Sequence, residues 1–292
     1  MKYEKLSLLL LGFLIVASCN FSGVDKEKDE SFRENGKSVE SQDSTEKITS
    51  EVITPEIEKA PIDTLFLNNG IYIVYKEKGS GEQVKDNDVI WIDYTCRLTD
   101  GKVFDTNKKL GKPIPYMVGW GLQTEGWDIA VKELKEGDEV DIFLPAKYAR
   151  GEKGIPGVIP PNADNVITLK VNEVSAPDYT VDGVEVWVIN RGKTQPEVKE
   201  GDEILIDYFA HAKSNPRYDN SFKNGEPYQL KVGGGSNLPG LNIALSKAKL
   251  SDKLWVRIPA RHAFGTKGNL NLVKPNESVF FDLRILKILD AN

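Results

Sequence analysis

The fold is decided by a stretch of sequence that the chain contains twice. Residues 92–105 read IDYTCRLTDGKVFD, and residues 206–219 read IDYFAHAKSNPRYD. The same offset of 114 residues relates Gly126 to Gly240, and no gap is needed from Val84 onwards. A period of this length is too long for a solenoid repeat and matches one small domain, so the sequence predicts a tandem duplication.

The two copies and the residues that precede them give four predicted segments for the 292-residue chain. They are a lipoprotein signal peptide over 1–19, a disordered tether over 20–63, a first domain over 64–177 and a second, divergent domain over 178–292. Each of the two domains is large enough to bury a core of its own. We expect the chain to be a monomer.

The first 19 residues have the features of an export signal. Lys2 and Lys5 precede an apolar run from Leu6 to Val16, which is too short to cross a bilayer. The following Ala-Ser-Cys ends at Cys19 and resembles the bacterial lipobox, in which the Cys is acylated and becomes the new N-terminus. A signal peptide that is cleaved elsewhere, with an incidental Cys, is the alternative.

The segment from Asn20 to about Ala60 is rich in Lys, Glu, Asp, Ser and Thr. Such a composition buries too little apolar area to offset the entropy of ordering, so it predicts a solvated tether. Together with Cys19 it predicts a lipid-anchored protein of the cell envelope. Asn20 is not an Asp retention signal, which favours the outer membrane. The net charge of −6, without a Lys/Arg stripe, argues against a nucleic-acid partner.

Apolar periodicity predicts an α+β domain in each copy. Residues of period two and β-branched character predict strands at Val89–Leu98 and Glu203–Ala212, and further strands at 140–145, 166–174, 254–259 and 280–288. A helix is predicted from Gly126, because apolar residues follow at i, i+3, i+4 and i+7 from Trp127. The expected result is a mostly antiparallel sheet with one short helix packed across it.

Further motifs complete a family pattern. Gly126-Trp127 is followed by PAKYARG over 145–151 and IPPNA over 159–163. Together with residues 94–105, these motifs resemble the FKBP-type peptidyl-prolyl cis-trans isomerases, and the second copy resembles that family mainly through the internal repeat. The resemblance implies two tandem FKBP-like domains, each a twisted, mostly antiparallel sheet wrapped on one short helix.

In that family the pocket is an apolar cup with a Trp floor, aromatic walls and a rim that carries an Asp and a Tyr hydroxyl. The resemblance places the catalytic positions of the first domain at Tyr94, Phe104, Asp105, Trp127 and Ile159, and the substrate-binding positions at Ile114, Gln123, Thr124, Arg150, Val158 and Ile167. It places the second-domain pocket at Tyr208, Asp219, Tyr228, Leu238, Leu241, Phe264 and Phe281.

Several of these positions depart from the family pattern. Ile114 and Ile167 replace wall Phe residues, Gln123-Thr124 replaces a Val-Ile pair, and Arg150 replaces a rim Tyr. The Gln123-Thr124 backbone still supplies an N–H donor, and Arg150 can donate where Tyr would. The lost aromatic walls predict reduced activity in the first domain. In the second domain Leu241 replaces the Trp floor, which favours binding over catalysis.

Isomerisation of an X-Pro bond requires no nucleophile, metal or cofactor, and the sequence predicts none of them. An apolar cup disfavours the polar planar amide relative to the twisted one, whose formation costs about 20 kcal/mol in water. His211 and His262 lie at unmatched positions and are predicted to be surface or strand residues. Asp105 either polarises the substrate carbonyl or only fixes the rim loops, and the sequence leaves both roles open.

The remaining Trp and Cys residues have structural interpretations. Trp127 is predicted to be the pocket floor, although a Trp that starts an amphipathic helix is also good core filler. Cys96 is predicted to be a small buried hydrophobe. The other four tryptophans have no counterpart in the family pattern and are expected in core or loop packing: Trp91, Trp120, Trp187 and Trp255.

Three classes of function fit the sequence. The first is a membrane-tethered foldase that isomerises X-Pro bonds of exported proteins, with proline-containing polypeptides as its clients. The second is a non-catalytic chaperone or proline-peptide-binding lipoprotein with degenerate pockets. The third is a structural surface lipoprotein whose repeats serve as spacers. An isomerase assay separates the first class from the other two.

Overall fold

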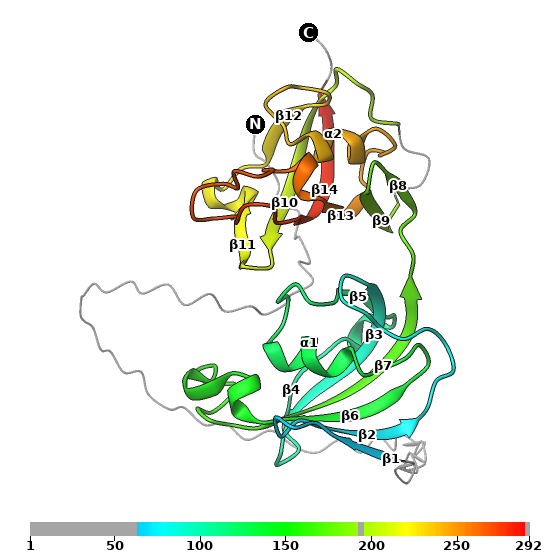
Figure 1. Ribbon diagram of the computed structural model, residues 1–292, viewed down its shortest axis with the longest axis vertical. Helices are drawn as coiled ribbons and strands as arrows, with labels where there is room; N and C mark the ends of the chain where they lie inside the picture. The colour runs from blue at the N-terminus through cyan, green and yellow to red at the C-terminus, as the bar shows by residue number, and fades with distance from the viewer. Residues whose placement is uncertain (1–62, 192–195, 290–292) are drawn as a thin grey trace, which may run out of the picture. The chain divides into compact units, whose positions relative to one another are not determined.

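The computed structural model describes residues 63–191 and 196–289. The predicted signal peptide with Cys19 and almost all of the predicted tether lie outside these residues. Both copies of the repeat belong to one compact unit, Lys59–Asn292. Each copy folds into a seven-stranded sheet in which every pairing is antiparallel (Figure 1).

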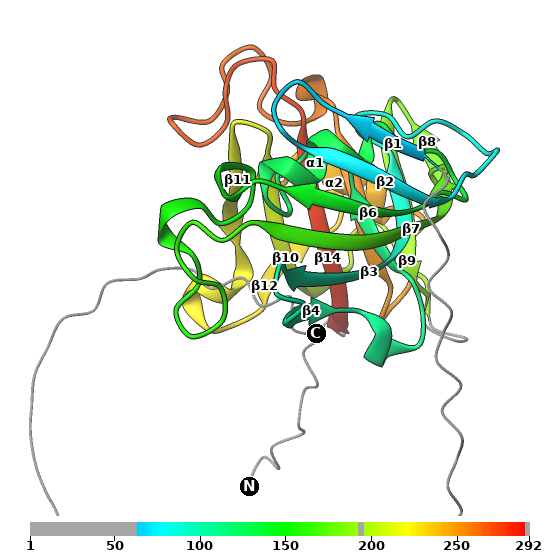
Figure 2. The same cartoon turned by 90° about the horizontal axis from the view of Figure 1, so that it is seen from below.

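The first sheet has the strand order β1-β2-β6-β7-β3-β4 (Figure 2). In addition, β5 pairs with β3. Its strands are β1 Asp63–Phe66, β2 Tyr72–Glu77, β3 Val89–Leu98, β4 Val103–Thr106, β5 Ile114–Met117, β6 Glu139–Leu144 and β7 Asn165–Ser175. Helix α1 covers Glu125–Val131, and short 3-10 helices cover Lys108–Leu110, Ala146–Tyr148 and Gly151–Lys153.

The second sheet repeats this topology with the order β11-β10-β14-β13-β9-β8, and β12 pairs with β10. Its strands are β8 Tyr179–Val181, β9 Val184–Asn190, β10 Glu203–Ala212, β11 Asn215–Asn220, β12 Tyr228–Lys231, β13 Lys253–Ile258 and β14 Val279–Leu289. Helix α2 covers Pro239–Leu245, and 3-10 helices cover Ser221–Asn224 and Ala260–His262. The predicted α+β class with one short α-helix per copy is confirmed.

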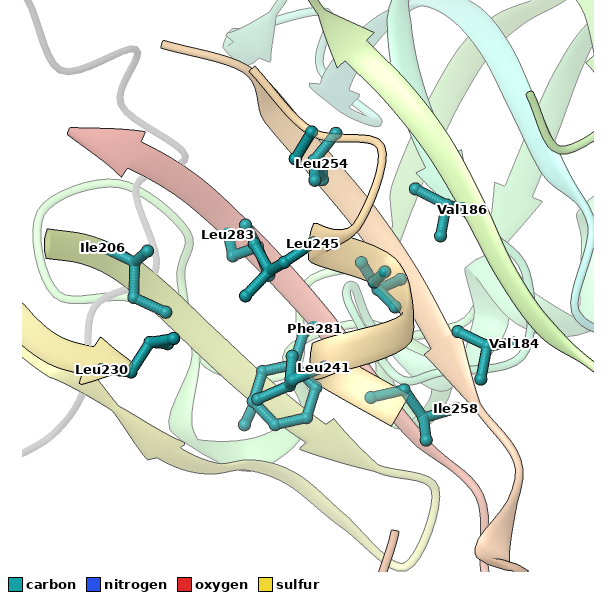
Figure 3. Close-up of a cluster of buried hydrophobic side chains, with 14 of the residues drawn as sticks. Val184, Val186, Ile206, Leu230, Leu241, Leu245, Leu254, Ile258, Phe281 and Leu283 are labelled. Carbon is teal, nitrogen blue, oxygen red and sulfur yellow. The ribbon is translucent and has the colours of Figure 1, made fainter. Parts of the chain in front are cut away.

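One face of each sheet packs against its helix and forms the domain core. In the second domain, Leu241 and Leu245 of α2 lie over a surface of aliphatic and aromatic side chains from the sheet (Figure 3). That surface includes Ile206, Leu230, Leu254, Ile258, Phe281 and Leu283. Burial of one such side chain contributes about 1.5–3 kcal/mol, so this apolar face is what holds the helix on the sheet.

A glycine near the start of each helix permits this close packing. A Cβ on Gly126 would stand 2.7 Å from the Tyr148 carbonyl oxygen and 2.8 Å from Leu144. A Cβ on Gly240 would stand 2.2 Å from Ile258. The helix axis therefore approaches the sheet at a distance that only glycine tolerates, and the duplication retains it in both copies.

His211 lies in a strand, β10, which is one of the two placements that the sequence predicts for it. It is only 3% exposed, and the sequence does not predict this burial. Its ring centroid is 5.4 Å from that of Phe280, and its Nδ1 makes no hydrogen bond. His211 is buried because the outward-facing side of β10 is covered by aromatic residues, and local sequence alternation does not reveal such a cover.

The buried imidazole predicts a loss of stability in mild acid. Burial lowers the pKa of His211 to about 4, with a smaller contribution from Arg217. The unfolded side chain titrates near pH 6.5, so below that pH the unfolded chain binds more protons and folding loses stability. We expect the free energy of unfolding to fall by about 2 kcal/mol between pH 7 and pH 5. Urea titrations of the wild type and of His211→Gln measure this slope, and equal slopes would contradict the prediction.

Candidate active site

The first domain places an aromatic floor at the N-terminus of α1. Trp127 is 5% exposed, and its ring meets Tyr94 of β3 edge-on at a centroid distance of 5.4 Å. Tyr116 of β5 lies 5.8 Å from the same ring on another side. Ile114 and Ile167 belong to the same buried cluster, with Phe104 packed against it. The structure therefore brings side chains from four strands, β3, β4, β5 and β7, into one apolar cluster with Trp127 of α1.

A hydroxyl and a carboxylate form a hydrogen-bonded pair beside this aromatic floor. The Tyr94 hydroxyl donates to Asp105 Oδ2 at 3.1 Å. Burial raises the pKa of Tyr94, and the nearby charge of Asp105 raises it further. The hydroxyl therefore stays protonated at neutral pH and acts as a hydrogen-bond donor rather than as an acid.

The two substituted rim positions contact each other. Arg150 Nη2 donates to Gln123 Oε1 at 3.4 Å, so these two side chains connect the loop after β6 to the loop before α1. Thr124 is the N-cap residue of α1, and its buried Oγ1 makes no hydrogen bond. Ile159 is buried and Val158 half-buried in the loop that follows, where Ile155 and Ile159 form an isolated bridge. Of the predicted substrate-binding positions, Gln123, Thr124, Arg150 and Val158 thus lie outside the strands, whereas Ile114 and Ile167 lie on β5 and β7.

Cys96 is a free and buried thiol on the pocket side of β3. Burial raises its pKa, and the charge of Asp105 adds to that effect while Arg150 opposes it. The thiol is therefore neutral at pH 7 and a poor nucleophile. This agrees with its predicted role as a small hydrophobe.

Sequence reasoning missed the residues that hold the pocket loops. Asp128 accepts hydrogen bonds from the Tyr116 hydroxyl at 2.6 Å and from the backbone N–H groups of Gly119 and Gly121 at 2.7 and 3.0 Å. These bonds fix the loop over 118–124, which carries Gln123 and Thr124. The usable signal was an acidic residue in the first turn of the helix, close in sequence to a glycine-rich loop.

Asn107 was also missed. It is 2% exposed, accepts from the Tyr94 backbone N–H at 2.7 Å, and donates to Asp93 Oδ1 and to the Lys112 carbonyl oxygen. It therefore ties the loop after β4 to β3 next to the rim Tyr. The second copy has Ser221 at this place, which accepts from the Tyr208 backbone N–H at 3.1 Å.

The second domain contains an open cavity of about 230 Å³ at the equivalent place. All seven residues predicted for the second-domain pocket line it: Tyr208, Asp219, Tyr228, Leu238, Leu241, Phe264 and Phe281. The sequence prediction omitted six further lining residues: Ile206, Tyr218, Ser236, Asn237, Asn269 and Leu272. The cavity is therefore a mixed aromatic and aliphatic cup with a few polar groups at its mouth.

In the second pocket a lysine is bonded to the rim carboxylate. The Tyr208 hydroxyl donates to Asp219 Oδ2 at 2.7 Å, and Lys223 Nζ donates to Asp219 Oδ1 at 2.9 Å. Burial acts to raise the pKa of Asp219, but the hydrogen bonds from Lys223 and Tyr208 outweigh it and the pKa is lowered. The carboxylate is thus charged and held at both oxygens.

The described residues contain no cluster of His, Cys, Asp and Glu that could hold a metal ion. Within the same residues, no helix has the length and apolar character needed to cross a membrane.

Comparison with known proteins decides the family. The model of the FKBP-type peptidyl-prolyl cis-trans isomerases matches residues 80–172 and 194–286, which together are more than half of the chain. The chain belongs to this family. The two matched ranges correspond to the two copies of the repeat, so both are FKBP domains, and the predicted tandem arrangement is confirmed.

Several curated FKBP proteins are similar to the chain. Peptidyl-prolyl cis-trans isomerase FKBP10 of Mus musculus is 26% identical over 203 residues, which cover 70% of this chain and 35% of that protein. Peptidyl-prolyl cis-trans isomerase FKBP4 of Homo sapiens is 27% identical over 226 residues, covering 75% and 48%. FK506-binding protein 4 of Neurospora crassa is 36% identical over 116 residues, covering 40% and 24%. The chain thus spans about a quarter to a half of the length of these relatives.

Among solved structures, the three FKBP domains of wheat FKBP73 are similar to the chain at 23% identity and a TM-score of 0.38. The match covers 77% of this chain and 97% of that one.

Proposed function

We propose that this FKBP protein is a peptidyl-prolyl cis-trans isomerase whose first domain is the catalyst. The observation that carries the proposal is the Trp127 floor, buried beneath Tyr94, with the Tyr94–Asp105 hydrogen bond at the rim. The clients are X-Pro bonds of exported proteins, which the predicted signal peptide supports.

The proposed mechanism is selective stabilisation of the twisted amide. Rotation about an X-Pro bond breaks amide resonance, at a cost of about 20 kcal/mol. The twisted carbonyl is less polarised than the planar one, so the apolar surface around Trp127 disfavours the ground state more than the transition state. Each 1.4 kcal/mol of such selectivity raises the rate about tenfold.

The polar groups of the rim have a positioning role in this mechanism. The Arg150 guanidinium makes only a long hydrogen bond, 3.4 Å, to the Gln123 side chain, so it can turn to the carbonyl group of a bound peptide. The backbone N–H groups at Gln123-Thr124 are the second proposed donors to the peptide. Asp105 is oriented by the Tyr94 hydroxyl. No proton needs to move, which agrees with the protonated state of Tyr94.

The second domain is proposed to bind clients without turnover. Its cavity retains the aromatic walls but has Leu241 in place of the Trp floor. Tyr228 at the mouth is 46% exposed, whereas Ile114, the equivalent residue of the first domain, is buried. The exposed ring favours capture of apolar segments. It also supports the second candidate function, in which the whole chain is a non-catalytic chaperone.

A protease-coupled proline isomerisation assay on residues 59–292 tests the proposal. We expect catalysed isomerisation of an Ala-Leu-Pro-Phe-type peptide, at a rate that falls when proline-rich competitor is added. If the fragment gives no acceleration but still suppresses aggregation of an unfolded protein, the chaperone function replaces the enzyme function.

The lipid anchor is a separate proposal, supported by the lipobox-like residues that end at Cys19. Cys19→Ser removes the thiol that would be acylated, so we expect the variant to lose fatty-acid labelling and to leave the membrane fraction. A buried acyl chain contributes about 0.8 kcal/mol per CH₂, and its loss would release the protein. Equal metabolic labelling of the Ser variant and the wild type would remove the lipoprotein assignment.

A further inference from the structure

Three of the tryptophans outside the pockets gather in one cluster. Trp120, Trp187 and Trp255 are each at most 5% exposed and form a third apolar core with Val89, Met117 and Phe280. The Phe280 ring lies 5.7 Å from Trp120 and 5.3 Å from Trp255, and it meets Trp255 edge-on at 86°. This cluster combines residues of both FKBP domains within the compact unit Lys59–Asn292.

Comparison of the two copies shows that the second sheet is specialised for this contact. By the offset of the repeat, Trp255 and His211 correspond to Asp141 and Arg97. In the first domain these two residues form an ion pair at 2.9 Å on the outward face of the sheet. The same face is aromatic in the second domain, where His211 packs on Phe280. The fold itself therefore does not require these aromatic residues, and in the second domain Trp255 and Phe280 lie in one cluster with Trp120 of the first domain.

Polar and close backbone contacts surround the aromatic cluster. Lys213 Nζ forms an ion pair with Asp86 and lies 5.5 Å above the centre of the Trp120 ring. A Cβ on Gly121 would stand 3.0 Å from Pro216 Cγ, so the hairpin of β10 and β11 lies directly against the residue that follows Trp120. Trp120 is therefore held by the β10–β11 hairpin as well as by Phe280.

The loop that carries Trp120 also carries two of the predicted substrate-binding positions of the first domain. Its neighbours Gly119 and Gly121 both donate backbone hydrogen bonds to Asp128, and Gln123 and Thr124 follow directly along the chain. The loop is held on one side by Asp128 of its own domain and on the other by the second domain.

We propose that the second domain is a positioning element for the first pocket. Its aromatic face holds the loop over 118–124, so the placement of the backbone donors at Gln123-Thr124 depends on contacts that the first domain cannot make alone. The inference rests on the proposed function for its catalytic consequence, but the positioning itself is measurable without catalysis. Trp120 corresponds to Gly234 in the second copy, so the equivalent loop of the second domain has no ring at this position.

Phe280→Val in the complete chain tests the inference, because it gives the second domain the residue that the first copy has at this position, Val166. Hydrogen exchange of the amides in 118–124 should become at least tenfold faster, while exchange in the central strand β3 stays unchanged. The value of kcat/KM for proline isomerisation should fall about fivefold. Lys213→Gln changes a half-exposed side chain, so it should not impair folding. It should also accelerate loop exchange and lower kcat/KM, each by less than Phe280→Val does.

The matched control is Phe143→Val, the same substitution at an aromatic residue of the first sheet. Phe143 stacks on Tyr72 at 4.7 Å and is not part of the cluster, so loop exchange should not change. Unchanged loop exchange in folded Phe280→Val and Lys213→Gln proteins would overturn the inference. If exchange responds but the wild type has no isomerase activity, the proposed function fails and the positioning role stands.

Discussion

Trp127→Ala should lower kcat/KM for proline isomerisation by more than tenfold. The substitution removes the ring that closes the bottom of the first pocket, where it contacts Tyr94 and Tyr116. Water then enters the cup, and the preference for the less polar twisted amide is reduced. A loss of about 1.4 kcal/mol in transition-state stabilisation is enough for each factor of ten. The measurement is the protease-coupled assay on the wild type and the variant at equal concentration.

The control for this prediction comes from the second domain. Truncation of a buried Trp also opens a core cavity that costs about 3–5 kcal/mol, so circular dichroism must first show that the variant is folded. Trp127→Leu installs the residue that the second domain has at this position, Leu241, and leaves a smaller cavity. We expect Trp127→Leu to fold more stably than Trp127→Ala and to be similarly inactive. Full activity in either folded variant would show that Trp127 stabilises the core but does not contribute to catalysis.

The long central strands and the helix were predictable because they combine regular periodicity with sufficient length. β3 and β10 have the predicted bounds, Val89–Leu98 and Glu203–Ala212, and the predicted ranges for β6 and β7 differ from the structure by one residue at either end. The short strands β4, β5, β11 and β12 were not predicted as strands. Each has six residues or fewer and pairs with one side of a central strand, so its own sequence carries little alternation.

The pocket residues were predictable from the family motif, but the residues that hold the pocket loops in place were not. Residue-by-residue correspondence placed all seven second-domain positions on the cavity wall. It did not find Asp128 or Asn107, whose roles depend on hydrogen bonds to backbone groups of other loops. For Trp120, the sequence predicted only that the ring packs in a core or a loop. The contact of Trp120 with Phe280 joins residues that are distant in sequence, and no local pattern records such a contact.

Asp128→Ala should lower the free energy of unfolding of the first domain by about 3–5 kcal/mol. The carboxylate is the acceptor for the Tyr116 hydroxyl and for the N–H groups of Gly119 and Gly121. Tyr116 is 2% exposed, and burial, followed by the charge of Asp128, raises its pKa, so its hydroxyl remains a donor that needs a partner. A buried hydrogen bond to a charged group contributes about 1.5–3 kcal/mol, and the three bonds are not additive.

The second copy again supplies the matched variant. Asn242 occupies the position of Asp128, and its Oδ1 accepts the Gly233 backbone N–H at 3.0 Å. Asp128→Asn keeps one acceptor oxygen, so we expect it to cost about half as much as Asp128→Ala, because fewer donors are left unpaired. Urea denaturation of residues 59–292, followed by circular dichroism and total tryptophan fluorescence, measures both losses. If Asp128→Ala changes the free energy of unfolding by less than about 1 kcal/mol, the loop over 118–124 is held by its contacts with the second domain and not by this carboxylate.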